Sequence, residues 1–237
     1  MAKPSGIDGF FRVGMNAQGQ VTGGFEQIPF PREKSEIERQ MVANFIASMN
    51  THLSKSSEAF IFWDPVQNEE NDFDFTVETS HGPAYLELME IAPLSGPYET
   101  ASASYKPFEF ANVILEGIKR KSERYPKTMD RDLFLLLYVT HWAFDLSNPT
   151  ADCLRYWTAQ TPHVFRAIFS YEPFDAHEGG PGWIFPFPPE LLGTFDPETI
   201  RDNICLILDP KKGQVVSERK PSPPDATDAP PSANPGR

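Results

Sequence analysis

The segments Asp72-Phe-Asp-Phe-Thr-Val-Glu78 and Tyr85-Leu-Glu-Leu-Met-Glu-Ile91, joined by a short turn, decide the fold of this chain. Apolar and polar residues alternate in the first segment, which is typical of a strand with one buried face. Ser80-His-Gly-Pro83 supplies turn residues between the two. Together they predict a β-hairpin with acidic side chains on both strands.

The register of this hairpin determines which carboxylates meet. If Thr79 pairs with Ala84, then Asp74 and Glu87 share a face of the sheet, whereas a slip by one residue places Asp74 opposite Glu90. Two carboxylates a few ångströms apart at strand ends commonly bind a divalent metal ion. Both alternatives therefore predict a carboxylate pair with the chemistry of a metal ligand.

A long helix is predicted before the hairpin, from Ser35 to about Leu53. Ser35-Glu-Ile-Glu38 has the pattern of a capping box, and apolar residues then recur at helical spacing. The remaining patterns predict a hairpin over 9–28, strands over 59–63, 132–139, 164–171 and 203–208, and helices over 107–125 and 150–160.

The order of these elements predicts a single α/β (α+β) domain over 33–217, with a central mixed sheet and flanking helices. Residues 1–32 are expected to form an N-terminal β-hairpin extension. Residues 218–237 contain no large apolar side chain and many prolines, so we expect a disordered tail. The aromatic, Pro- and Gly-rich stretch 172–188 is predicted to be a long loop, in which Trp183 could stack on bases or plug the end of the sheet.

The order α-β-β-β-α-β over about 33–171 resembles the core of the PD-(D/E)XK nuclease superfamily, the restriction-endonuclease-like fold. The motif of that family is an acid on the second strand followed by acidic-X-lysine on the third. The resemblance implies that Asp74 (or Asp72) and Glu87 bind Mg²⁺ or Mn²⁺. Glu90 is a further candidate catalytic acid, because Glu-X-X-Glu strings end this strand in divergent members of the fold.

The lysine of the motif is missing, because Met89 occupies its position. Some families of this fold carry the lysine on the following helix, and Lys121 lies along the apolar stripe of the predicted helix 107–125. The resemblance therefore implies Lys121 as the catalytic lysine, while Lys119 points less directly inward. In the alternative interpretation, the stem of Lys121 covers the core margin and its charge reaches water. Glu38 is either an auxiliary acid or simply part of the capping box.

Composition limits the possible functions. The net charge of −12 disfavours a non-specific nucleic-acid binder, although a local basic patch remains compatible with it. Cys153 and Cys205 lack zinc-ligand spacing and are expected to be reduced. No nucleotide-binding glycine loop, HExxH string, leader peptide or membrane-length apolar run is present, so the sequence predicts a cytoplasmic protein.

Three functions are compatible with these observations. The first is a Mg²⁺-dependent nuclease that hydrolyses phosphodiester bonds in nucleic acid. The second is a catalytically degenerate member of the same fold that acts as a protein-interaction module, with the acidic stretch 68–72 in its surface. The third is an α/β protein without nuclease ancestry. A homodimer is also considered, because many enzymes of this fold dimerise.

Overall fold

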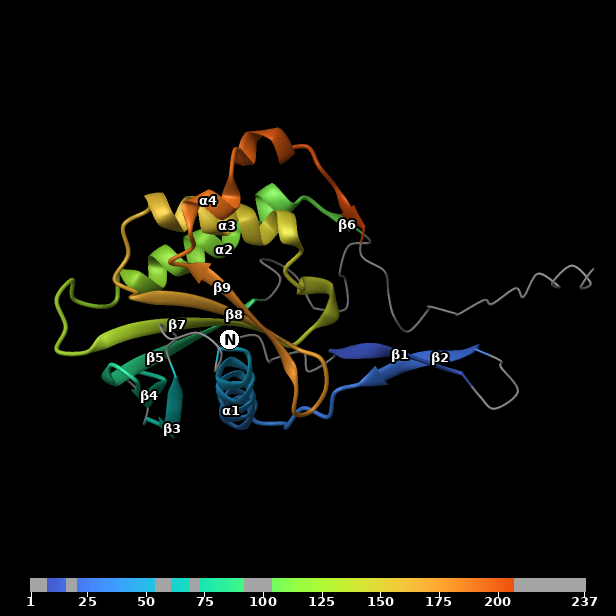
Figure 1. Ribbon diagram of the computed structural model, residues 1–237, viewed down its shortest axis with the longest axis horizontal. Helices are drawn as coiled ribbons and strands as arrows, with labels where there is room; N and C mark the ends of the chain where they lie inside the picture. Colours follow the sequence, from blue (N-terminus) through green and yellow to red (C-terminus); the bar gives the residue numbers. More distant parts are fainter. Residues whose placement is uncertain (1–7, 16–20, 54–60, 69–72, 92–103, 207–237) are drawn as a thin grey trace, which may run out of the picture.

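The protein is a mixed α/β structure built on one central sheet, with helices on both faces (Figure 1). The computed structural model describes residues 8–15, 21–53, 61–68, 73–91 and 104–206. The predicted tail over 218–237 lies outside these residues, as does Asp72. The predicted α/β class with a central mixed sheet is confirmed.

The central sheet has six strands in the order β3-β4-β5-β7-β8-β9. The pairs β3–β4, β4–β5 and β8–β9 are antiparallel, whereas β5–β7 and β7–β8 are parallel. The strand bounds are β3 (Phe62–Gln67), β4 (Phe75–Thr79), β5 (Gly82–Ile91), β7 (Asp132–Val139), β8 (Ala167–Pro173) and β9 (Gly179–Phe185). β7 has the bounds predicted from its apolar run, and all of it after Asp132 is buried, as expected for a strand covered on both faces.

The helices form two layers around this sheet, with α1 on one face and α2 and α3 on the other (Figure 1). Their bounds are α1 (Lys34–Leu53), α2 (Pro107–Ser122), α3 (Asn148–Gln160) and the short α4 (Pro189–Leu192), with 3₁₀ turns η2 (Trp142–Phe144) and η3 (Pro197–Ile200). Among the described residues, no helix combines the length and apolar character needed to cross a membrane.

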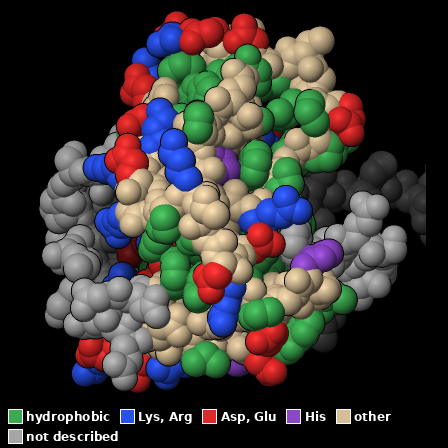
Figure 2. All heavy atoms as spheres, turned by 90° about the vertical axis from the view of Figure 1, so that its left-hand side faces the viewer, with side chains coloured by type: hydrophobic (Ala, Val, Ile, Leu, Met, Phe, Trp, Pro, Cys, Tyr) green, Lys and Arg blue, Asp and Glu red, His purple; other side chains and the backbone are tan. Residues whose placement is uncertain are grey.

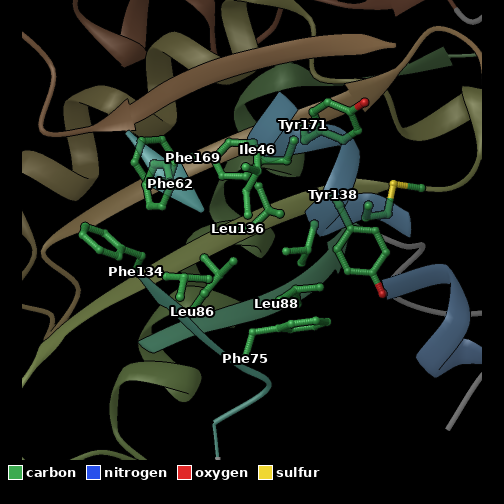
Figure 3. Close-up of a cluster of buried hydrophobic side chains, with 14 of the residues drawn as sticks. Ile46, Phe62, Phe75, Leu86, Leu88, Phe134, Leu136, Tyr138, Phe169 and Tyr171 are labelled. Carbon is green, nitrogen blue, oxygen red and sulfur yellow. The ribbon is translucent and has the colours of Figure 1, made fainter. Parts of the chain in front are cut away.

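The alternation of β5 divides its side chains between two cores. Leu86 and Leu88 join the cluster on the α1 side, where Figure 3 shows them with Phe75, Phe134 and other buried side chains. Tyr85, Met89 and Ile91 point to the cluster under α2 and α3 instead. This division decides which layer each acidic residue of β5 faces.

Two smaller β-structures lie outside the central sheet. The hairpin of β1 (Gly9–Met15) and β2 (Val21–Gln27) confirms the predicted N-terminal hairpin and projects from one side of the domain (Figure 1). β6 (Ser104–Tyr105) pairs with β10 (Cys205–Leu206), so the strand predicted over 203–208 begins two residues later than expected and its described part lies outside the main sheet.

The predicted loop over 172–188 is wrong in part, because it contains β9. Gly179 and Gly182 let this strand approach β8 closely: a Cβ atom at either position would lie 2.4 Å from a side-chain atom of Tyr171 or Ser170. Glycines that suggested a loop therefore permit strand pairing here. Trp183 packs edge-on against Phe169, with ring centroids 4.7 Å apart, so it belongs to the core margin.

The start of α1 also differs from the prediction. The helix begins at Lys34, one residue before the expected cap, so Ser35 lies inside the first turn. Glu38 instead forms an ion pair with Lys34, in which Nζ of Lys34 lies 3.0 Å from Oε1 of Glu38. The capping box is therefore replaced by a contact between side chains one turn apart.

Candidate active site at the β4–β5 hairpin

The register of the β4–β5 hairpin differs from both expected alternatives. Thr79 pairs with Gly82, and Phe75 pairs with Leu86. The loop therefore holds only Ser80 and His81, and Gly82 has a φ of +111°, which glycine adopts without strain. This tight turn places Asp74, just before β4, beside Glu87 rather than opposite Met89 or Glu90.

Asp74 and Glu87 are tied together through the backbone. The amide of Asp74 donates to Oε1 of Glu87 at 3.2 Å, and Oδ2 of Asp74 accepts from the amide of Leu88 at 2.7 Å. These bonds continue the hairpin for one position past its last paired residues. Both carboxylates are therefore positioned by the strands themselves.

Lys121 reaches this pair from α2. Its Nζ atom lies 2.5 Å from Oε2 of Glu87 and 3.6 Å from Oδ2 of Asp74. The side chain of Glu87 is only 2% exposed and that of Lys121 only 13%. Lys119, two residues earlier, forms an exposed pair with Glu116 at 2.8 Å. The structure thus brings together three residues predicted for the site: Asp74, Glu87 and Lys121.

Burial governs the electrostatics of Glu87. Desolvation raises its pKa and the charge of Asp74 adds to the rise, while the Lys121 ammonium and hydrogen bonds from Lys121 and Tyr125 oppose it. Burial together with the bond to Glu87 raises the pKa of the Tyr125 hydroxyl. Tyr125 is thus a neutral donor to the site. Sequence reasoning placed it only in the apolar stripe, although its position one turn after Lys121 was the available signal.

Met89 occupies the position at which the resemblance expects a lysine, and its side chain packs in the core. It packs against the cluster under α2, and a Cβ atom on Gly117 would lie 3.0 Å from its sulfur atom. The absence of a side chain at Gly117 therefore allows α2 to pass close over β5 at this point. The same close approach brings Lys121, one turn further along α2, to the carboxylates.

The structure does not bring Glu90 into this group. Glu90 belongs to the opposite face of β5, where Thr140 donates a hydrogen bond to its carboxylate. Burial raises the pKa of Glu90, and the charge of Glu38 contributes to the rise. Glu38 itself accepts from the hydroxyl of Tyr138 at 3.4 Å. β5 thus carries a buried carboxylate, Glu87, toward one helical layer and a half-buried one, Glu90, toward the other.

The Asp74–Glu87 pair suits Mg²⁺ in its donor type. Mg²⁺ prefers hard oxygen ligands and is commonly bound by one or two carboxylates together with water and substrate phosphates. Within the described residues, no group of three or more His, Cys, Asp or Glu side chains is arranged around a metal position. The pair therefore fits a metal ion that takes its remaining ligands from water and substrate.

Comparison of the chain with protein-family models, with curated proteins and with solved structures finds no match. The functional assignment accordingly depends on the fold and on the geometry of these side chains.

Proposed function

We propose that this protein is a divergent metal-dependent nuclease of the restriction-endonuclease-like fold, which hydrolyses phosphodiester bonds in nucleic acid. The observation that carries the proposal is the convergence of Asp74, Glu87 and Lys121 from β4, β5 and α2. The element order supports it, since α1 precedes three antiparallel strands and α2 leads to a fourth strand parallel to the third.

Each residue has a distinct role in this proposal. Asp74 and Glu87 would bind Mg²⁺ or Mn²⁺, which acts as a Lewis acid on a phosphoryl oxygen and lowers the pKa of bound water. Lys121 positions the attacking water by hydrogen bonding and stabilises the negative charge that develops on the phosphate. Tyr125 orients the Glu87 carboxylate through the hydrogen bond that its hydroxyl donates. Glu90 lies on the other face of β5 and has no direct role here.

A second candidate function is a protein-interaction module derived from the same fold. The ion pair between Lys121 and Glu87 favours it, because the ammonium already neutralises the buried carboxylate without a metal ion. The apolar packing of Met89 in place of the motif lysine and the net charge of −12 favour it as well. In this function we expect the protein to bind no metal ion, and Glu87→Ala to leave partner binding unchanged.

Cleavage assays with Mg²⁺ or Mn²⁺ on duplex and single-stranded DNA and RNA test the first proposal. We expect wild-type cleavage to fall by about a hundredfold or more in Glu87→Gln, because a neutral amide binds a hard cation weakly. Glu116→Gln, an exposed change on α2, is the matched control and should keep wild-type activity. Far-UV circular dichroism checks that both variants are folded.

Metal titration by calorimetry separates the two candidate functions. Binding of Mn²⁺ that is lost in Asp74→Asn supports the nuclease. Absence of both metal binding and cleavage for every substrate, with a duplex included in the titration, would reject catalysis and favour the interaction module.

A further inference from the structure

Basic residues are concentrated in one segment next to the candidate site. Residues 119–131 contain six basic and only two acidic side chains, although the whole chain has a net charge of −12. The six are Lys119, Arg120, Lys121, Arg124, Lys127 and Arg131. The segment comprises the last turn of α2 and the connection to β7, so it is a local exception to the charge of the molecule.

Most of these charges face solvent, and three of them form no ion pair among the described residues. Arg120, Arg124, Lys127 and Arg131 are exposed. Lys119 pairs with Glu116, and Arg131 lies 3.9 Å from Asp130. Among the described residues, no ion pair is found for Arg124 or Lys127. Arg120 lacks an ion pair as well, but its Nε donates to the backbone carbonyl of Glu116 at 3.3 Å. Arg124 and Lys127 therefore present the most available positive charge of the segment.

The segment is physically continuous with the carboxylate site. Lys121 and Tyr125, which both contact Glu87, alternate along the chain with the exposed Arg124 and Lys127. A phosphate held by Arg124 and Lys127 would thus lie close to the group proposed to cleave it. Figure 2 looks onto the side of the molecule where the loop after α2 lies, and shows Lys and Arg side chains spread among acidic ones.

A column of stacked side chains supports this surface from below. Phe73 stacks on both Tyr85 and Tyr125, with ring centroids 3.8 Å and 5.0 Å away, and the guanidinium of Arg131 lies over the Tyr85 ring, 5.3 Å from its centroid. The three rings are half-buried and stack on one another, so they are poor platforms for an unpaired base.

We propose that residues 119–131 bind the phosphate backbone of a nucleic-acid duplex, with Arg124 and Lys127 making the principal contacts. The inference rests on the proposed nuclease function and names its substrate class. Exposed positive charge beside rings that already stack on one another is suited to the phosphates of a duplex and less suited to the unstacked bases of a single strand. The surface becomes acidic again toward Asp130 and Asp132, which confines the contact to a narrow strip.

Fluorescence anisotropy of the full chain with labelled duplex DNA, in EDTA to prevent cleavage, tests this surface. We expect Arg124→Ala/Lys127→Ala to weaken binding by about tenfold or more and to lower the slope of log K against log salt by about two. Arg32→Ala/Arg39→Ala removes two exposed charges near and on α1, across the sheet, and is the matched control. It should leave both quantities unchanged. Duplex RNA and single-stranded DNA are run in parallel, and the duplexes should bind more tightly.

Several outcomes would overturn the inference. The first is the absence of duplex binding in about 50 mM salt, and the second is binding by Arg124→Ala/Lys127→Ala that equals wild-type binding. The third is tighter binding of the single strand than of the duplexes, and the fourth is binding to anionic lipid vesicles in place of nucleic acid. Cleavage in Mg²⁺ separates this inference from the proposed function. Duplex binding without cleavage rejects the nuclease and keeps the surface, whereas cleavage that is insensitive to Arg124 and Lys127 rejects the surface alone.

Discussion

The Glu87 carboxylate is the most deeply buried charge of the candidate site. An ion pair in such a place contributes little net stability, because desolvation of both charges offsets their attraction. Removal of one partner is costly, however, since the other charge stays buried without compensation. The Lys121–Glu87 pair is therefore a sensitive point for stability, whether or not the protein is an enzyme.

We expect Lys121→Met to reduce the free energy of unfolding by about 3–5 kcal/mol, because it leaves the charge of Glu87 unpaired. Lys119→Met changes an exposed lysine of the same helix and should change the free energy of unfolding by no more than about 0.5 kcal/mol. Urea unfolding at neutral pH measures both. Glu87→Leu/Lys121→Met should recover much of the loss, and a double variant no more stable than Lys121→Met would contradict this account.

At the level of elements, the fit between α2 and β5 decides where a lysine can act. Gly117 allows Met89 to fill the space between the helix and the strand. A charged side chain at position 89 would be placed under the helix rather than beside the carboxylates. The helix supplies the ammonium group from Lys121 instead. The core position of Met89 and the reach of Lys121 to the carboxylates both depend on the close packing of α2 on β5.

Met89→Lys introduces the lysine of the nuclease motif that the sequence resembles, yet we expect it to destabilise the protein by roughly 1–3 kcal/mol without raising cleavage. The control is Met89→Leu, a nearly volume-conserving change that should cost less than about 1.5 kcal/mol. Thermal unfolding and the cleavage assay give the two readouts. A stable Met89→Lys protein with increased metal-dependent cleavage would show that the strand position, and not Lys121, is the functional one.

At the level of the whole molecule, Asp8 lies just before the N-terminal hairpin, close enough to the main sheet for its charge to interact with that of Glu172 on β8. It is 2% exposed, its Oδ1 accepts from the amide of Gly9, and its Oδ2 is buried without a hydrogen-bond partner among the described residues. Burial raises the pKa of Asp8 to about 7, the amide of Gly9 opposes the rise, and the charge of Glu172 on β8 adds to it. Asp145 lies near enough for its charge to interact with that of Asp8.

This raised pKa predicts a loss of stability as the pH rises from about 4 to about 7. The unfolded chain releases the Asp8 proton near the ordinary value of 3.8, whereas the folded protein keeps it until about pH 7. Stability therefore falls as pH rises through this interval, by up to about 4 kcal/mol. Urea unfolding between pH 4 and 8 should show that Asp8→Asn removes this part of the fall. Asp202→Asn, an exposed change, should run parallel to wild type, and a parallel Asp8→Asn curve would disprove the assignment.

The sequence by itself determined the elements whose side-chain period is a local property. The apolar run 132–139 predicted β7 with its observed bounds, and the spacing of Lys121 from Ile118 predicted that this lysine turns toward the sheet. Helix and strand periods follow from backbone geometry within a few residues, so one segment is enough to reveal them.

Only the tertiary structure decided which carboxylate meets which partner. The tight turn at Ser80 and His81 set a register that no pattern in the strands specified, and it joined Asp74 to Glu87 while leaving Glu90 on the other face. Pairing between strands depends on turn geometry and on the fit of both layers, and these contacts form between distant residues. A one-residue difference in the turn would have built a different site from the same acidic residues.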